Sequence, residues 1–167
     1  MSNRPEDTKK GLFRRETKGL VTEPVSLLLE RRSIASFARI LGVADPVFYD
    51  VAAARAQGQP DIVAPPSFAV VVEALAEERR ADQGEIPLTT LLGCDFRYLL
   101  HGEQHYSYTG LLHAGDEVSV TTRIVDFYEK RGGLLEFAVL EMVIGHAARG
   151  PIVHAKRILV HRLGQDR

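Results

Sequence analysis

The feature that most constrains the fold is one apolar helix followed by four strand-like segments. Residues 67–80 have helical spacing, with little polar surface on any side until the charged end at residues 77–80. A helix that is apolar nearly all round is normally buried. We therefore predict a central helix over residues 67–80 whose charged end is solvated. One face of this helix consists of Phe68, Val71, Val72 and Leu75.

The hydrophobic period changes in the second half of the chain. Val, Ile, Thr and aromatic residues, which favour strands, dominate four segments. These segments are residues 99–108, 117–128, 134–144 and 151–162. Glycine-containing turns between them favour antiparallel neighbours, and Val118, Val120, Thr122 and Ile124 should share one sheet face. The pattern predicts an α+β fold, in which an antiparallel sheet of about five strands wraps around the central helix.

Shorter helices precede the central one. Ser33 is a suitable N-cap for a helix that ends at Gly42. Asp50 can cap a second short helix over residues 51–57. Three prolines then enforce an extended loop before residue 67; they are Pro60, Pro65 and Pro66.

Length and composition limit the class of protein. A chain of 167 residues fits one domain, which we place at residues 11–167, after a charged tail at residues 1–10 that we expect to be disordered. The net charge of -1 gives no general attraction for nucleic acid. No signal peptide and no apolar run of about 18 residues is visible. A cytoplasmic protein without membrane contacts is the expectation.

The sequence offers little for a metal or a nucleotide cofactor. His101 and His105 would lie about 13 Å apart on a strand, too far for one ion. Cys94 is the single cysteine, and we expect it to be a buried structural thiol. No glycine-rich nucleotide fingerprint is present. We expect no metal and no cofactor.

The order of these segments, over residues 19–162, resembles the N-terminal-type MaoC-like (FAS1-like) dehydratase domain. The resemblance implies a single hot-dog fold and an acyl substrate carried as a CoA or acyl-carrier-protein thioester. It also implies a role in fatty acid metabolism and dimers or double hot-dogs. The segments that carry it are residues 25–32, Phe37-Ala38, Asp45-Pro46 with Asp50, residues 52–55, Gly58, residues 64–68, residues 101–104, Gly115-Asp116 and residues 128–131.

Catalytic members of this family hold the reacting water with an Asp and a His near the turn that contains Asp45-Pro46. The resemblance implies that the acid falls on Val43 and the His on Phe48, and neither side chain can transfer a proton. It therefore implies the non-catalytic, acyl-binding half of an (R)-specific enoyl-thioester hydratase or 3-hydroxyacyl-thioester dehydratase. We expect no fused catalytic half, so the partner would be a second copy or a separate catalytic MaoC-like hot-dog chain.

Three alternatives stay open. Asp45 could supply a rearranged acid in a self-sufficient hydratase, although a turn-holding role is favoured. Glu73 could serve as the general base of a hot-dog thioesterase, although its place off the apolar face favours a surface position. The chain could also be a binding or assembly subunit without chemistry. The resemblance implies a substrate-binding helix start at Pro66, Ser67 and Phe68, with capping the favoured role of Ser67.

Overall fold

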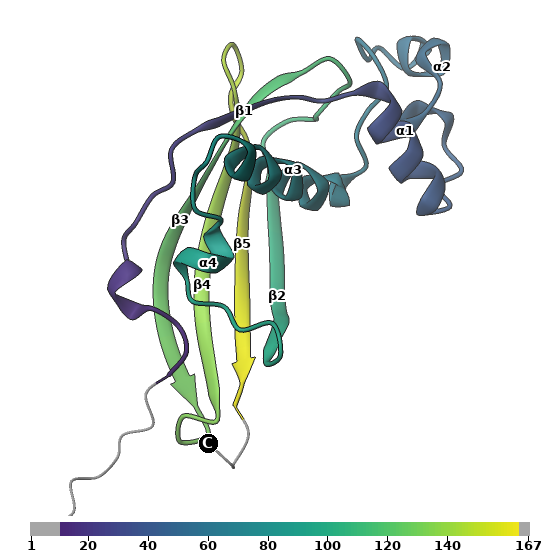
Figure 1. Cartoon of the computed structure of the whole chain (residues 1–167). Helices are drawn as coiled ribbons and strands as arrows, with labels where there is room; N and C mark the ends of the chain where they lie inside the picture. Colours follow the sequence, from purple (N-terminus) through teal and green to yellow (C-terminus); the bar gives the residue numbers. More distant parts are fainter. Residues whose placement is uncertain (1–10, 164–167) are drawn as a thin grey trace, which may run out of the picture.

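The computed structural model describes residues 11–163; residues 1–10, predicted as a disordered tail, and residues 164–167 lie outside this range. Five strands form one antiparallel sheet that curves around a long helix, as the sequence predicted (Figure 1). The strands are β1 (Val25–Leu28), β2 (Leu99–Tyr108), β3 (Glu117–Lys130), β4 (Leu135–His146) and β5 (Gly150–Arg162). The four predicted strands are thus confirmed to within two residues at each end.

The strand order is β1-β3-β4-β5-β2. The expected pairing of successive strands is confirmed for β3, β4 and β5. It is wrong for β2, which crosses to the far side of the sheet and pairs with β5 instead of β3. Strands β1 and β2 are therefore the two edges. The predicted inner face of β3 is confirmed, because Val118, Val120, Thr122 and Ile124 are all buried.

The helices are α1 (Arg31–Ile40), α2 (Val51–Ala56), α3 (Ala69–Asp82) and α4 (Leu88–Leu91), with 3-10 turns at Arg15–Thr17, Pro46–Phe48 and Pro66–Phe68. Helix α1 starts two residues before Ser33, so the predicted N-cap is wrong. Gly42 ends α1 as expected, with a φ of 68°. No helix among residues 11–163 is long and apolar enough to cross a membrane.

Helix α3 is the predicted central helix, but its buried face is not purely apolar. Ala69, Val72 and Ala76 are buried together with Glu73 and Arg80. The expected solvated end is wrong for Arg80, which is only 2% exposed. Its guanidinium donates to Thr22 Oγ1 at 2.8 Å and to two backbone carbonyls. A charge can be buried there because these oxygens replace the water it loses.

A polar band divides the inner face of the sheet. One apolar cluster lies beneath α3, and a second, near α4, contains Phe13 and Leu92. Along β5, Ala155 belongs to the first cluster and Leu159 to the second, with Arg157 between them. Gln104 on β2 is the register partner of Arg157. Polar groups therefore meet between two hydrophobic halves of the molecule.

Candidate functional site

The turn that would hold a catalytic pair follows α1, in the part of the chain that projects beyond the sheet (Figure 1). The amide of Val43 donates to the carbonyl of Ala38 at 3.1 Å, which continues the end of α1. Phe48 ends the 3-10 turn Pro46–Phe48 and packs, half-buried, against the cluster beneath α3. Both side chains are hydrocarbon, so this turn has no proton donor or acceptor at either position.

The polar residues beside this turn hold backbone groups. Asp45 Oδ1 accepts from the amide of Val47 at 2.9 Å, and Asp50 Oδ1 accepts from the amide of Ala53 at 2.8 Å. The first bond caps the 3-10 turn and the second caps α2, which confirms the predicted cap at Asp50. Both carboxylates therefore have a structural use in the described chain.

The predicted substrate-binding residues form the 3-10 turn that leads into α3. Ser67 is exposed and makes no capping hydrogen bond, so its favoured role as a helix cap is wrong. Phe68 is buried and packs edge-on against Phe37, with ring centroids 5.5 Å apart. The carbonyl of Pro66 accepts a hydrogen bond from the Tyr108 hydroxyl. The start of α3 is therefore fixed by β2 and by the core.

Glu73 does not face the surface, contrary to the expectation. It is 7% exposed, and its Oε1 lies 2.6 Å from Nη1 of Arg157 on β5. Burial raises the pKa of the Glu73 carboxyl, and the positive charge of Arg157 opposes that rise. A signal was present in the sequence, because Arg157 alternates with Ala155 and Leu159 on an apolar strand face. A charge on such a face needs a buried partner.

Two polar residues of β2, the edge strand, lie next to this ion pair. Gln104 and Tyr106 lie on the same strand face, beside Arg157 and Ala155 of β5. Among residues 11–163, both polar atoms of the Gln104 amide and the Tyr106 hydroxyl are buried without a hydrogen-bond partner. Burial also raises the pKa of Tyr106, and the negative charge of Glu73 adds to the rise. Sequence reasoning did not single out this cluster.

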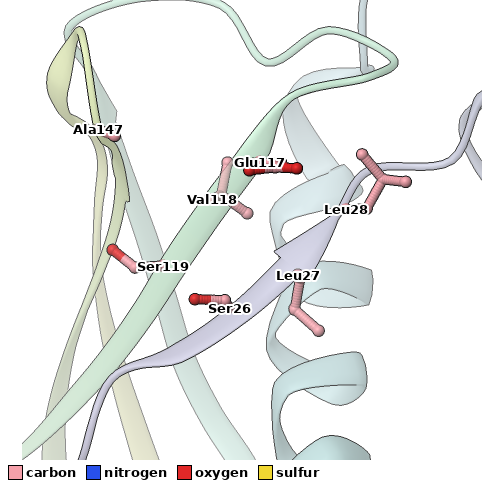
Figure 2. Close-up of a pocket in the computed structure, with 7 residues that line it drawn as sticks. All are labelled: Ser26, Leu27, Leu28, Glu117, Val118, Ser119 and Ala147. Carbon is pink, nitrogen blue, oxygen red and sulfur yellow. The ribbon is translucent and has the colours of Figure 1, made fainter.

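Two grooves lie along β1. The first, drawn in Figure 2, is on the outer side of the β1–β3 pair, and Glu117 is the titratable residue among those lining it. Glu117 therefore has no second titratable group beside it in the lining of this groove. The second groove, of about 470 Å³, lies between β1 and α3. It is lined by Leu27, Leu28, Leu29, Glu30, Ser33, Phe68, Leu75, Glu78, Arg79 and Asp82.

The histidines and the cysteine do not assemble into a reactive site. Within residues 11–163, no group of three or more His, Cys, Asp or Glu residues is placed to hold a metal ion. His113 is buried, with Nε2 2.9 Å from Gln59 Oε1, and burial lowers its pKa. Burial raises the pKa of the half-buried Cys94 thiol to about 11, which keeps it protonated at neutral pH.

Comparison with known families gives a match over most of the chain. The model described as "FAS1-like, dehydratase domain region" matches residues 16–155. A UPF0336 protein of Clavibacter michiganensis subsp. michiganensis is 34% identical over 139 residues, which are 83% of this chain and 87% of that protein. UPF0336 protein Lxx02810 of Leifsonia xyli subsp. xyli is 32% identical over 135 residues, covering 81% and 85%. These names state no activity.

Solved structures share the fold. A chain of the truncated HadBC (3R-hydroxyacyl-ACP dehydratase) complex of Mycobacterium tuberculosis superposes with a TM-score of 0.68 at 17% identity, over 86% of this chain and 96% of that one. The ChsH1–ChsH2 complex of the same organism gives 0.63 at 18% identity, over 88% and 91%. A MaoC-like dehydratase gives 0.71 at 19% identity, over 89% of this chain and 43% of that one. The predicted hot-dog fold is confirmed.

Proposed function

Because the chain belongs to the FAS1-like dehydratase domain family, we propose that it is one component of an (R)-specific enoyl-thioester hydratase or 3-hydroxyacyl-thioester dehydratase. In this proposal it supplies the non-catalytic, acyl-binding half. The observation that carries the proposal is the turn after α1. The resemblance aligns the acid and the histidine with Val43 and Phe48, whose side chains are hydrocarbon, and the carboxylates of Asp45 and Asp50 beside them are used as caps.

The chemistry explains why this observation matters. Addition of water to an α,β-unsaturated thioester needs a base for the water and a proton for Cα. It also needs hydrogen-bond donors for the carbonyl oxygen as charge develops there. Hydrocarbon side chains at Val43 and Phe48 can line an acyl chain, but they cannot move either proton. The missing groups would come from a partner.

The groove between β1 and α3 is the acyl-binding surface that we propose. Its inner wall is hydrocarbon, from Leu27, Phe68 and Leu75, and its rim carries charged residues of α3. Its volume of about 470 Å³ is within the range that small-molecule pockets occupy. An acyl chain would contact the wall, while its CoA or acyl-carrier-protein group stays outside.

The proposed partner is a second hot-dog chain, either another copy or one that carries the Asp and His. Two of the structural neighbours, HadBC and ChsH1–ChsH2, are complexes. In this chain both sheet edges, β1 and β2, end without a further strand among residues 11–163. Such edges are normally paired or covered.

A thioesterase that uses Glu73 is less well supported. A general base must reach the water that it activates. Glu73 is nearly inaccessible, its carboxylate is bound to Arg157, and it lines neither groove along β1.

Hydration of crotonyl-CoA by the purified chain tests the proposal. We expect rates about 10²–10⁴-fold below those of a hydratase with a positioned acid and base. Adding a hot-dog chain that carries the Asp and His should give rapid turnover. Asp45→Asn should leave the low rate of the isolated chain unchanged. Rapid hydration by this chain alone that disappears in Asp45→Asn would replace the proposal with the rearranged-acid hydratase.

A further inference from the structure

The groove between β1 and α3 runs from the start of α1 to the end of α3. The strand and the helix follow opposite directions along it (Figure 1). At one end Phe68, just before α3, contacts Phe37 of α1. At the other end Arg80, near the end of α3, donates to the carbonyl of Glu23, which precedes β1. The two ends lie about 20 Å apart, at a rise of about 1.5 Å per helical residue, so different residues surround them.

Negative charge gathers at the end that lies beside the last turns of α3. Glu78 and Asp82 line the groove there, and both are exposed. Within residues 11–163, the ion pairs of α3 are formed by other residues of this helix, so neither carboxylate has an ion-pair partner. The carbonyl end of a helix carries partial negative charge as well. Arg79 is the single cation in the lining of the groove, and it offsets only part of this charge.

The end beside α1 is closer to neutral. Glu30 and Ser33 line the groove at this end. Arg31 is paired with Asp61, and the exposed Arg32 offsets the charge of Glu30. The amides in the first turn of α1 add partial positive charge. An anionic group is therefore tolerated better at this end of the groove than at the end of α3.

We propose that Glu78 and Asp82 restrict the groove to acyl chains whose far end carries no negative charge. The phosphate groups of the carrier stay outside at the α1 end, and the far end of the acyl chain lies between Leu75 and Asp82. A carboxylate at that end of the chain would meet two others, whereas a methyl group or an ammonium group would not be repelled. The inference rests on the acyl-binding role proposed above, and it adds the direction of the bound chain and the class of acyl group.

Binding of three acyl-CoA probes to the full chain separates the effect of charge from that of polarity. The probes are hexadecanoyl-CoA and its ω-carboxyl and ω-amino analogues, each measured by displacement of a fluorescent acyl-CoA. Both analogues end in a charged, hydrated group, so loss of water disfavours both and only the sign of the charge differs. We expect the ω-amino analogue to bind about tenfold more tightly than the ω-carboxyl analogue at low salt. At about 1 M salt, where the Debye length is about 3 Å, most of this difference should disappear.

Charge-removing variants assign the preference to the two carboxylates. Glu78→Gln together with Asp82→Asn should reduce the affinity ratio of the two analogues to about twofold or less. Glu141→Gln, at an exposed position on the outer face of β4, is the matched control and should leave the ratio unchanged. Equal affinity of the wild-type chain for the two analogues, or a ratio that survives in the double variant, would overturn the proposal. Tighter binding of the ω-carboxyl analogue that Arg79→Gln abolishes would overturn it as well.

These binding measurements do not depend on catalysis. If hexadecanoyl-CoA did not bind at all, the acyl-binding role would fail and the inference would fail with it. If all three probes bound without discrimination, only the inference would be lost. If the isolated chain hydrated crotonyl-CoA rapidly, the non-catalytic role would fail and the measured charge preference would stand.

Discussion

At the scale of single residues, Glu73 illustrates how a charge can serve the fold. Its carboxylate contacts Arg157 where two apolar clusters meet, beneath α3. Partial removal from water raises the pKa of Glu73, and Arg157 compensates. Such a pair adds little stability compared with two hydrophobic residues in its place. Removing only one member, however, leaves the other charge buried without a partner. The pair therefore ties α3 to β5 as a unit.

A double-mutant cycle should reveal this coupling. Glu73→Leu should lower the free energy of unfolding by about 3 kcal/mol, because the Arg157 charge stays buried without its partner. Glu73→Leu together with Arg157→Leu should recover most of that loss. Urea denaturation measures both. Glu78→Leu, at an exposed position on the same helix, is the control and should change stability by less than about 0.5 kcal/mol. A neutral Glu73→Leu would contradict the predicted coupling.

At the scale of elements, the short helices around the candidate turn depend on their ends. Helix α2 has six residues, too few to be stable by itself. Asp50 starts it by accepting from the amide of Ala53, and Gly58, with a φ of 78°, follows its end. Asp45 caps the turn Pro46–Phe48 in the same way, by accepting a hydrogen bond from the amide of Val47. Caps therefore hold this region in place. The carboxylates of Asp45 and Asp50 accept backbone hydrogen bonds there, so they are already engaged in the fold.

Replacing the cap of α2 should therefore be measurable. We expect Asp50→Ala to destabilise the protein by about 1 kcal/mol, whereas Asp50→Asn should be nearly neutral because Asn caps helices equally well. Thermal unfolding followed by circular dichroism compares the two. A cost as large for Asp50→Asn as for Asp50→Ala would mean that the charge, and not the hydrogen bond, is what matters.

At the scale of the whole molecule, the segment before β1 covers the end of the sheet that α3 does not reach. The amide of Leu12 donates to Oε2 of the buried Glu136 at 2.7 Å. The ring of Phe13 stacks on His161 of β5, with centroids 3.9 Å apart. The amide of Arg14 donates to the carbonyl of Leu92, just beyond α4. The segment before β1 and the residue after α4 thus pack together over the second apolar cluster, although they are far apart in the sequence.

Gly11 permits this closure, since a Cβ there would lie 1.4 Å from Glu136 Oε1. Gly11→Ala should separate Leu12 from Glu136 and lower the free energy of unfolding by about 1–3 kcal/mol. Gly110→Ala is a matched control, because its nearest neighbour would be Ile152 at 3.9 Å and its φ is not positive. Without a clash, Gly→Ala is neutral or stabilising through the unfolded chain. Chemical denaturation should show a loss of stability for Gly11→Ala and none for Gly110→Ala, and equal stability of the two variants would contradict this account of Gly11.

The sequence by itself determined the local structure and the hydrocarbon character of Val43 and Phe48. The strands were predictable because a half-buried strand imposes a period of two on its own residues. The Asp50 cap and the Gly42 helix end were predictable because each depends on neighbouring residues. Val43 and Phe48 could be read in the same way, since a hydrocarbon side chain cannot transfer a proton in any fold.

Only the tertiary structure decided which polar residues face inward. Glu73 and Arg80 looked like surface residues because helical periodicity assigns a face by hydrophobicity alone. They are buried because Arg157, Thr22 and backbone carbonyls far along the chain supply their partners. The pairing of β2 was likewise beyond the sequence: the turns favoured β3, its neighbour along the chain, which is wrong, because β2 reaches β5 across the sheet. The unpaired groups of Gln104 and Tyr106 became visible only through that pairing.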